Sequence, residues 1–179
     1  MSAEAAAPIF VFAPFVSSTM RVDPAWIDYN GHMNVAYYVV LFDRAVDEAF
    51  EVAGLGKDYL DERGLSYFTA ELHVRYLREL SVHEDVRITA QIVDHDEKRI
   101  HAYLEIRHAR EAWVAAACEK MFLHVDMATR RVAPFPPDIL SNLVAMKAAH
   151  ERLRRPALLG RSIGLASPAE PEAGAGTRH

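Results

Sequence analysis

The longest apolar pattern in the chain covers residues 35–53, directly after the polar stretch D-Y-N-G-H-M-N at 28–34. Apolar side chains recur there at intervals of three and four residues, which is helical spacing. The first half is apolar on nearly every side, which predicts burial all round, and Gly54 stands where such a helix would end. β-branched residues also permit a strand, but the length of the pattern favours a helix. The pattern therefore predicts a central helix enclosed by the rest of the fold.

Later stretches of the chain alternate apolar and polar residues with a period of two, which is typical of half-buried antiparallel strands. On the first of them we expect Ala70, Leu72, Val74 and Tyr76 to share one face. The stretch D-H-D-E-K-R at 94–99 predicts a tight hairpin. We predict strands over residues 15–23, 69–76, 86–92, 100–107 and 113–125.

The sheet region ends at a cluster of prolines between residues 134 and 137. Asp138 is placed to cap a last helix over residues 139–153. From Pro156 onward Pro, Ala, Gly and Ser predominate, which predicts a disordered tail. We therefore expect a folded domain over residues 1–155 and a tail over residues 156–179. The fold class is α+β, with a curved antiparallel five-stranded sheet wrapped around the central helix and a C-terminal helix beside it.

Composition narrows the class of protein. Of the 179 residues, 51% are hydrophobic and 25% charged, with a formal net charge of −5. No basic stripe dominates, which argues against nucleic acid as a partner. The only cysteine, Cys118, rules out an internal disulfide and suits a reducing compartment. No apolar run approaches the roughly 20 residues of a membrane span, and the N-terminus lacks the charged start of a signal peptide. We expect a cytoplasmic protein with no membrane partner.

Candidate chemistry is concentrated in residues 28–34. Asn30-Gly31 is a strong hairpin signal, yet a plain hairpin needs neither Asp28 before it nor His32 and Asn34 after it. Taken singly, Asp28 is a turn residue, His32 a structural histidine and Asn34 a helix N-cap. Taken together, immediately before a buried helix, they suggest a catalytic loop.

This motif and the order of elements resemble the hotdog-fold thioesterases of the 4-hydroxybenzoyl-CoA thioesterase type. Many members carry D-x-N-G-H-x-N followed by a tyrosine, which matches Asp28 to Asn34 and then Tyr37 or Tyr38. The plant acyl-carrier-protein thioesterases have a similar loop. The resemblance covers roughly residues 15–135 and implies a hotdog fold acting on an acyl-CoA substrate.

The resemblance also implies roles for the motif. Asp28 would be the general base for water or a nucleophile, and the free N–H groups of the central helix would hold the oxyanion. Gly31 would let substrate approach the backbone. His32 and Asn34 would orient Asp28, the carbonyl or water. Glu71, on the polar face of its strand, is either a second site acid or a solvated carboxylate. No cofactor and no metal are implied.

Three further stretches, at 70–80, 94–101 and 119–134, are similar to the betainyl-CoA thioesterases of carnitine catabolism. That subgroup implies a small acid bearing a trimethylammonium group. Such a cation needs an aromatic lining, for which Trp26 and Tyr37 are the first candidates, although both also suit a plain core. The family further implies a homodimer or higher homo-oligomer, since an open sheet edge favours pairing.

Two alternatives stay open, and a third is set aside. A hotdog-fold enoyl-CoA hydratase or dehydratase would carry D-x-N-P-x-H, with its histidine one residue further on than His32. A non-catalytic acyl-CoA binding protein would bind without turnover. Residues 160–164 match G-x-S-x-G by chance, because a nucleophile elbow needs a strand before it and a helix after it. The cations available to hold CoA are Arg75, Arg78, Lys98, Arg99, Arg130 and Arg131.

Overall fold

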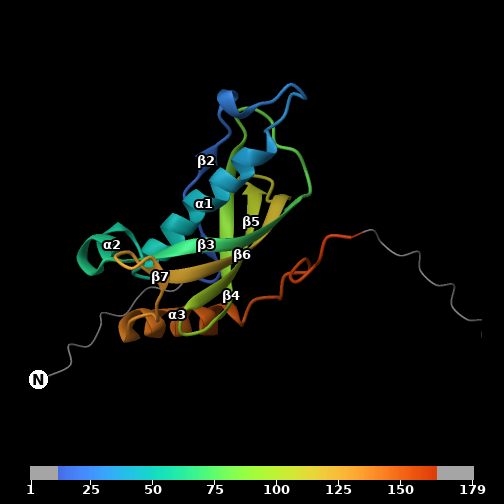
Figure 1. The fold of residues 1–179 in the computed structure, drawn as a ribbon. Helices are drawn as coiled ribbons and strands as arrows, with labels where there is room; N and C mark the ends of the chain where they lie inside the picture. The colour runs from blue at the N-terminus through green and yellow to red at the C-terminus, as the bar shows by residue number, and fades with distance from the viewer. Residues whose placement is uncertain (1–11, 165–179) are drawn as a thin grey trace, which may run out of the picture.

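A computed structural model describes residues 12–164 as one antiparallel sheet with three α-helices (Figure 1). The four long strands are β3 (Leu65–Tyr76), β4 (Asp85–His95), β5 (Arg99–His108) and β6 (Val114–Asp126). The three short strands are β1 (Phe15–Val16), β2 (Met20–Arg21) and β7 (Arg131–Val132). The helices are α1 (Val35–Val52), α2 (Lys57–Arg63) and α3 (Pro137–His150), with a 3-10 turn at Pro24–Trp26.

The sheet runs in the order β1-β4-β5-β6-β3, with β2 added to β4 and β7 to β6. The predicted hairpin joins β4 to β5, where Asp96 accepts hydrogen bonds from the amides of Lys98 and Arg99 at 2.8 Å each. β3 stands at the end of this order, so one of its edges pairs with no strand among residues 12–164. The predicted strands over 69–76, 86–92, 100–107 and 113–125 are confirmed with small changes in their ends.

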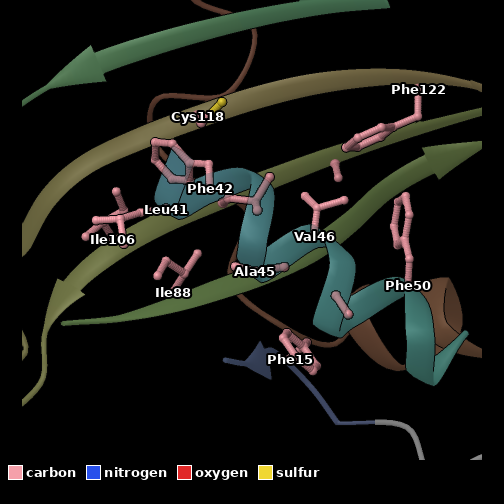
Figure 2. Close-up of a cluster of buried hydrophobic side chains, with 14 of the residues drawn as sticks. Phe15, Leu41, Phe42, Ala45, Val46, Phe50, Ile88, Ile106, Cys118 and Phe122 are labelled. Atoms are coloured by element: carbon pink, nitrogen blue, oxygen red, sulfur yellow. The ribbon is translucent and has the colours of Figure 1, made fainter. Parts of the chain in front are cut away.

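The central helix is confirmed as α1, which lies across the curved sheet (Figure 1). Its buried face packs onto strand residues such as Ile88, Ile106 and Phe122, as Figure 2 shows. Burial all round its first half is wrong for the single chain, because Val35 is 58% exposed. The buried residues of α1 are Tyr38, Leu41, Phe42, Ala45, Val46, Ala49 and Phe50.

The strand predicted over 15–23 is split into β1 and β2, since side-chain bonds interrupt the backbone ladder. The Ser17 hydroxyl accepts from the amide of Ile88 at 2.9 Å, and the amide of Ser18 donates to Glu48 at 2.7 Å. The helix α2 and the strand β7 were not predicted. Their short lengths give no periodic pattern to recognise.

A β-bulge at Ala70 changes the predicted faces of β3. Thr69 pairs with Phe122 and Glu71 with Met121, so the alternation shifts by one residue between them. Leu72 and the following even-numbered residues face α1 as expected. Before the bulge, Thr69 shares that face instead of lying opposite to it.

The C-terminal helix is confirmed as α3, packed against β4. Asp138 does not cap it, which corrects that prediction: Pro136 is the cap residue, and Asp138 accepts hydrogen bonds from Arg63. Residues 156–164 of the predicted tail lie beside the sheet, where the amide of Gly160 donates to Glu119 at 2.7 Å. Residues 165–179 lie outside the described residues. None of the described helices has the length and apolar character to cross a membrane.

Candidate active site

The motif forms a small hairpin loop directly before α1. The amide of Asp28 donates to the carbonyl of His32 at 3.1 Å, and the amide of Gly31 donates to the carbonyl of Asp28 at 3.0 Å. Gly31 has φ +86°, a backbone conformation that favours glycine. Within the single chain, lack of space is not the reason for this glycine, because a Cβ there would meet no atom within 4 Å. Asp28 Oδ1 accepts from the amide of Asn30 at 2.8 Å. Its Oδ2 has no hydrogen-bond donor among the described residues.

Asn34 is the N-cap of α1, as the sequence suggests. Its side chain accepts from the amide of Ala36 at 3.0 Å, and its carbonyl accepts from the amide of Tyr37 at 3.1 Å. The amide of Val35 has no acceptor within residues 12–164. One helix-start N–H is therefore open next to the loop that carries Asp28.

The segment that follows β3 supports this loop. The carbonyl of Leu80 accepts from the amide of Met33 at 2.8 Å, while its amide donates to the Tyr38 hydroxyl at 3.2 Å. The Tyr76 hydroxyl donates to the carbonyl of Val35 at 3.2 Å. Burial raises the pKa of Tyr38, so its hydroxyl stays protonated. No local pattern in the sequence indicates this support, because the bonds join residues about 40 positions apart.

The other two predicted polar residues lie in different places. His32 Nε2 is 3.8 Å from Glu79 Oε2 at the surface of the loop. Glu71 faces the opposite side of the sheet from α1, in a hollow of about 530 Å³ that His73 and Glu119 also line. Within one chain, the structure does not bring Glu71 to Asp28.

The two predicted lining aromatics stack on each other beside α1. The ring centroids of Trp26 and Tyr37 are 5.2 Å apart, with 13° between the ring planes. The guanidinium carbon of Arg44 lies 5.4 Å from the Trp26 ring centroid. A cation of the protein itself therefore already lies over this tryptophan.

A second hollow, of about 740 Å³, lies at the other end of α1, between α1, α2 and β3. Asp43, Asp47 and Glu51 line it from successive turns of the helix. The Tyr67 hydroxyl donates to Asp47 at 2.8 Å, and burial raises the pKa of Tyr67 strongly. The four-residue spacing of these acids is visible in the sequence, but the sequence alone indicates only a solvated helix face.

A buried lysine lies behind this hollow. The side chain of Lys120 is 1% exposed, and its Nζ lies 3.1 Å from Asp43 Oδ1. Lys120 is on β6, in the inward-facing row that also holds Cys118 and Phe122. That alternation could have predicted an inward lysine, which is a rare position for this side chain.

Other chemistry is limited in the described residues. Burial raises the pKa of the Cys118 thiol to about 12, so it is not a thiolate nucleophile at neutral pH. Within residues 12–164 no group of three His, Cys, Asp or Glu side chains is placed to hold a metal ion.

Comparison with known proteins identifies the family. The Thioesterase-like superfamily matches residues 22–143. The chain is 36% identical over 142 residues to the betainyl-CoA thioesterase of Pseudomonas aeruginosa, a match that covers 79% of this chain and 89% of that protein. It is 37% identical over 144 residues to the L-carnitine dehydrogenase/betainyl-CoA thioesterase of Rhizobium meliloti, covering 80% of this chain but only 29% of that relative's length.

Solved structures agree with this assignment. A protein from Staphylococcus aureus in complex with CoA matches with a TM-score of 0.80 and 27% identity, over 89% of this chain and 100% of that one. The hotdog fold expected from the motif is therefore confirmed. The chain belongs to the thioesterase-like superfamily, close to the betainyl-CoA thioesterases.

Proposed function

We propose that the protein hydrolyses acyl-CoA thioesters to the free acid and CoA. The observation that carries this proposal is the motif loop. It holds a carboxylate oxygen without a donor, next to a helix-start amide without an acceptor, among the residues that the structure describes. Asp28 supplies the base or nucleophile, and the Val35 N–H is the donor available to an oxyanion. Asn34 acts through the helix it caps, because its Oδ1 is already bonded to Ala36.

As a general base, Asp28 takes a proton from water while the water oxygen bonds to the thioester carbonyl carbon. The oxyanion forms beside the helix start. When it collapses, the C–S bond breaks and the CoA thiolate takes the proton from Asp28. As a nucleophile, Asp28 would instead form an anhydride and release the thiolate, and water would then hydrolyse the anhydride. His32 lies at the loop surface, where it can orient water or the carbonyl.

The acting unit is a homodimer joined through β3. This twelve-residue strand has an edge that pairs with no other strand in the part of the chain that the structure describes, a form that favours pairing with a second chain. The edge is also apolar: Phe68 is 41%, Leu72 40% and Tyr76 47% exposed. These side chains would be covered by a second copy.

Antiparallel pairing of β3 with itself determines what meets across the interface. The midpoint of the strand lies between Ala70 and Glu71. A two-fold axis there sets the Tyr76 end of one copy opposite the Leu65 end of the other. Since Tyr76 bonds to Val35 beside the motif loop, the loop of one copy would face the 740 Å³ hollow of its partner.

The substrate class follows from the relatives. Two proteins 36–37% identical to this chain are named for betainyl-CoA hydrolysis, and a structural relative was solved with CoA. A betainyl or similarly small acyl group on CoA is therefore the proposed substrate.

A thiol-release screen with short, aromatic, long-chain and betainyl CoA esters tests the proposal. We expect thiol release, with the highest kcat/KM for small acyl groups. Tight binding without free thiol would favour the acyl-CoA binder. Loss of enoyl absorbance without free thiol would favour the hydratase. A kcat/KM that climbs with each methylene, at about 0.8 kcal/mol of buried CH₂, would contradict the small-acyl assignment.

A further inference from the structure

The surface around the stacked rings of Trp26 and Tyr37 is poorly suited to a cationic acyl group. The Arg44 guanidinium lies 5.4 Å from the Trp26 ring centroid, on the side chain expected to attract a cation. A second positive charge at this ring would have to displace or repel Arg44. Further along α1, the hollow at the edge of β3 is lined by charges of the opposite sign.

In the hollow at the β3 edge, two carboxylates carry uncompensated charge. Asp43 is paired with Lys120, and Lys57 is paired with Asp61. Neither Asp47 nor Glu51 pairs with a cation among the described residues. The lining is therefore negative at neutral pH, with the Tyr67 ring beside the charges.

Two of the three acids are held in place by side chains of other elements, which an ordinary solvated helix face does not need. The buried ammonium of Lys120 fixes Asp43, and the Tyr67 hydroxyl fixes Asp47. The carboxylate of Glu51, at the end of a flexible side chain, lies close to Gly56.

Burial of Lys120 is an independent sign that this arrangement is built. Its side chain is 1% exposed, whereas that of its partner Asp43 is 64% exposed. Withdrawing an ammonium from water costs free energy, and an exposed aspartate has no need of a buried partner. The effect of the pair is to hold one wall of the hollow in a single geometry.

We propose that this hollow binds the positively charged end of the acyl group, with Asp47 and Glu51 as the residues that select for charge. The inference rests on the proposed function and names the substrate class of the same site. Asp47 is twelve residues from Val35, which is about 18 Å along a helix. A betainyl nitrogen is one methylene from the thioester carbonyl. The hollow that serves a given Asp28 is therefore the one on the partner copy.

The test compares betainyl-CoA with 3,3-dimethylbutyryl-CoA, its uncharged isostere, in which carbon replaces nitrogen. We expect wild type to favour the betainyl ester at least ten-fold in kcat/KM. Asp47→Asn keeps an acceptor for Tyr67, and Glu51→Gln keeps the shape. Each should lower kcat/KM for the betainyl ester about ten-fold and change that for the neutral ester less than two-fold. Glu48→Gln is the control, because it removes the same charge from a neighbouring position of α1 whose carboxylate bonds to Ser18 and does not line the hollow.

The outcomes separate the two proposals. Equal kcat/KM for the two esters in wild type would overturn the charge-selecting role while leaving thioester hydrolysis in place. Equal losses on both esters in Asp47→Asn and Glu51→Gln would do the same. An equal loss of betainyl preference in Glu48→Gln would attribute the effect to net charge and also overturn it. Failure of wild type to release thiol from any CoA ester would remove the proposed function itself.

Discussion

The two ends of α1 hold their polar groups in different ways. At the N-terminal end, the loop with Asp28 is fixed mainly by backbone hydrogen bonds within residues 26–37. At the C-terminal end, the carboxylates of Asp43 and Asp47 are fixed by side chains from distant strands, Lys120 and Tyr67. The bonds that shape the loop itself are local in sequence, with support from Leu80 and Tyr76, whereas the bonds that fix the two carboxylates are all tertiary.

This difference suggests how the protein separates reaction from selection. A loop fixed by its own backbone keeps one geometry whatever the acyl group is. Side chains on a helix face can change without disturbing that loop. The proposed dimer would then join a reacting end from one copy to a selecting end from the other.

The largest effect should come from breaking the reacting end alone. Asp28→Asn keeps the turn preference and shape but removes the proposed base or nucleophile. We expect kcat to fall by roughly 10²–10⁴, with folding and CoA-ester binding unchanged. Thiol release measures kcat, and ligand titration measures the binding of the CoA ester. A variant that retains more than about a tenth of wild-type kcat would remove Asp28 from the mechanism.

The next effect separates the two ends by splitting the proposed dimer. Leu72→Glu places a charge on the apolar edge of β3, where Leu72 is 40% exposed. We expect a monomer by light scattering and a loss of kcat/KM of more than about ten-fold, because burying an unpaired carboxylate opposes association. Val144→Glu, at a 54% exposed position on α3, is the control and should change neither the light-scattering mass nor kcat/KM. A fully active Leu72→Glu monomer would contradict the shared site.

A smaller effect sharpens the account of the selecting end. Asp43→Asn leaves the Lys120 ammonium buried without a counter-charge, so the free energy of unfolding should fall. We expect a loss of roughly 1–3 kcal/mol, below the range for a fully buried pair because Asp43 is 64% exposed. Lys120→Met removes charge and keeps volume, and should cost less than about 1 kcal/mol. Urea unfolding measures the free energy of unfolding of both variants. A larger loss in Lys120→Met than in Asp43→Asn would make Lys120 a packing residue.

The smallest effect is expected away from both ends. Burial lowers the pKa of His150 from its ordinary 6.5, partly offset by a hydrogen bond to the Phe12 carbonyl. Below pH 6.5 the unfolded chain binds a proton that the folded chain resists. Stability should therefore be full above pH 6.5 and fall as the pH drops towards the folded pKa.

Unfolding curves at several pH values would measure this slope. His150→Gln should flatten it, whereas His73→Gln, on the far face of β3, should leave it as in wild type. An unchanged slope in His150→Gln would assign the pH dependence to other groups, among them His124, whose pKa burial also lowers.

The sequence predicted the fold well because its main elements are long and periodic. The apolar pattern of α1 and the alternating stretches that predicted β3 to β6 each cover seven residues or more, so that a chance match is rare. The motif loop was also predictable, because the hydrogen bonds that shape the turn itself are local. What the sequence could not supply was the hollow, since Lys120 and Asp43 are 77 residues apart. The short elements and the interrupted first strand depend on side-chain bonds that no local pattern records.

The bulge at Ala70 has a consequence for comparing this strand with its relatives. One extra residue reverses the parity of the strand, so that odd positions before it and even positions after it face α1. An alignment that places a gap one position away from Ala70 would exchange inward and outward roles for part of the strand. Roles should therefore be transferred across this point only after the extra residue has been located in both chains.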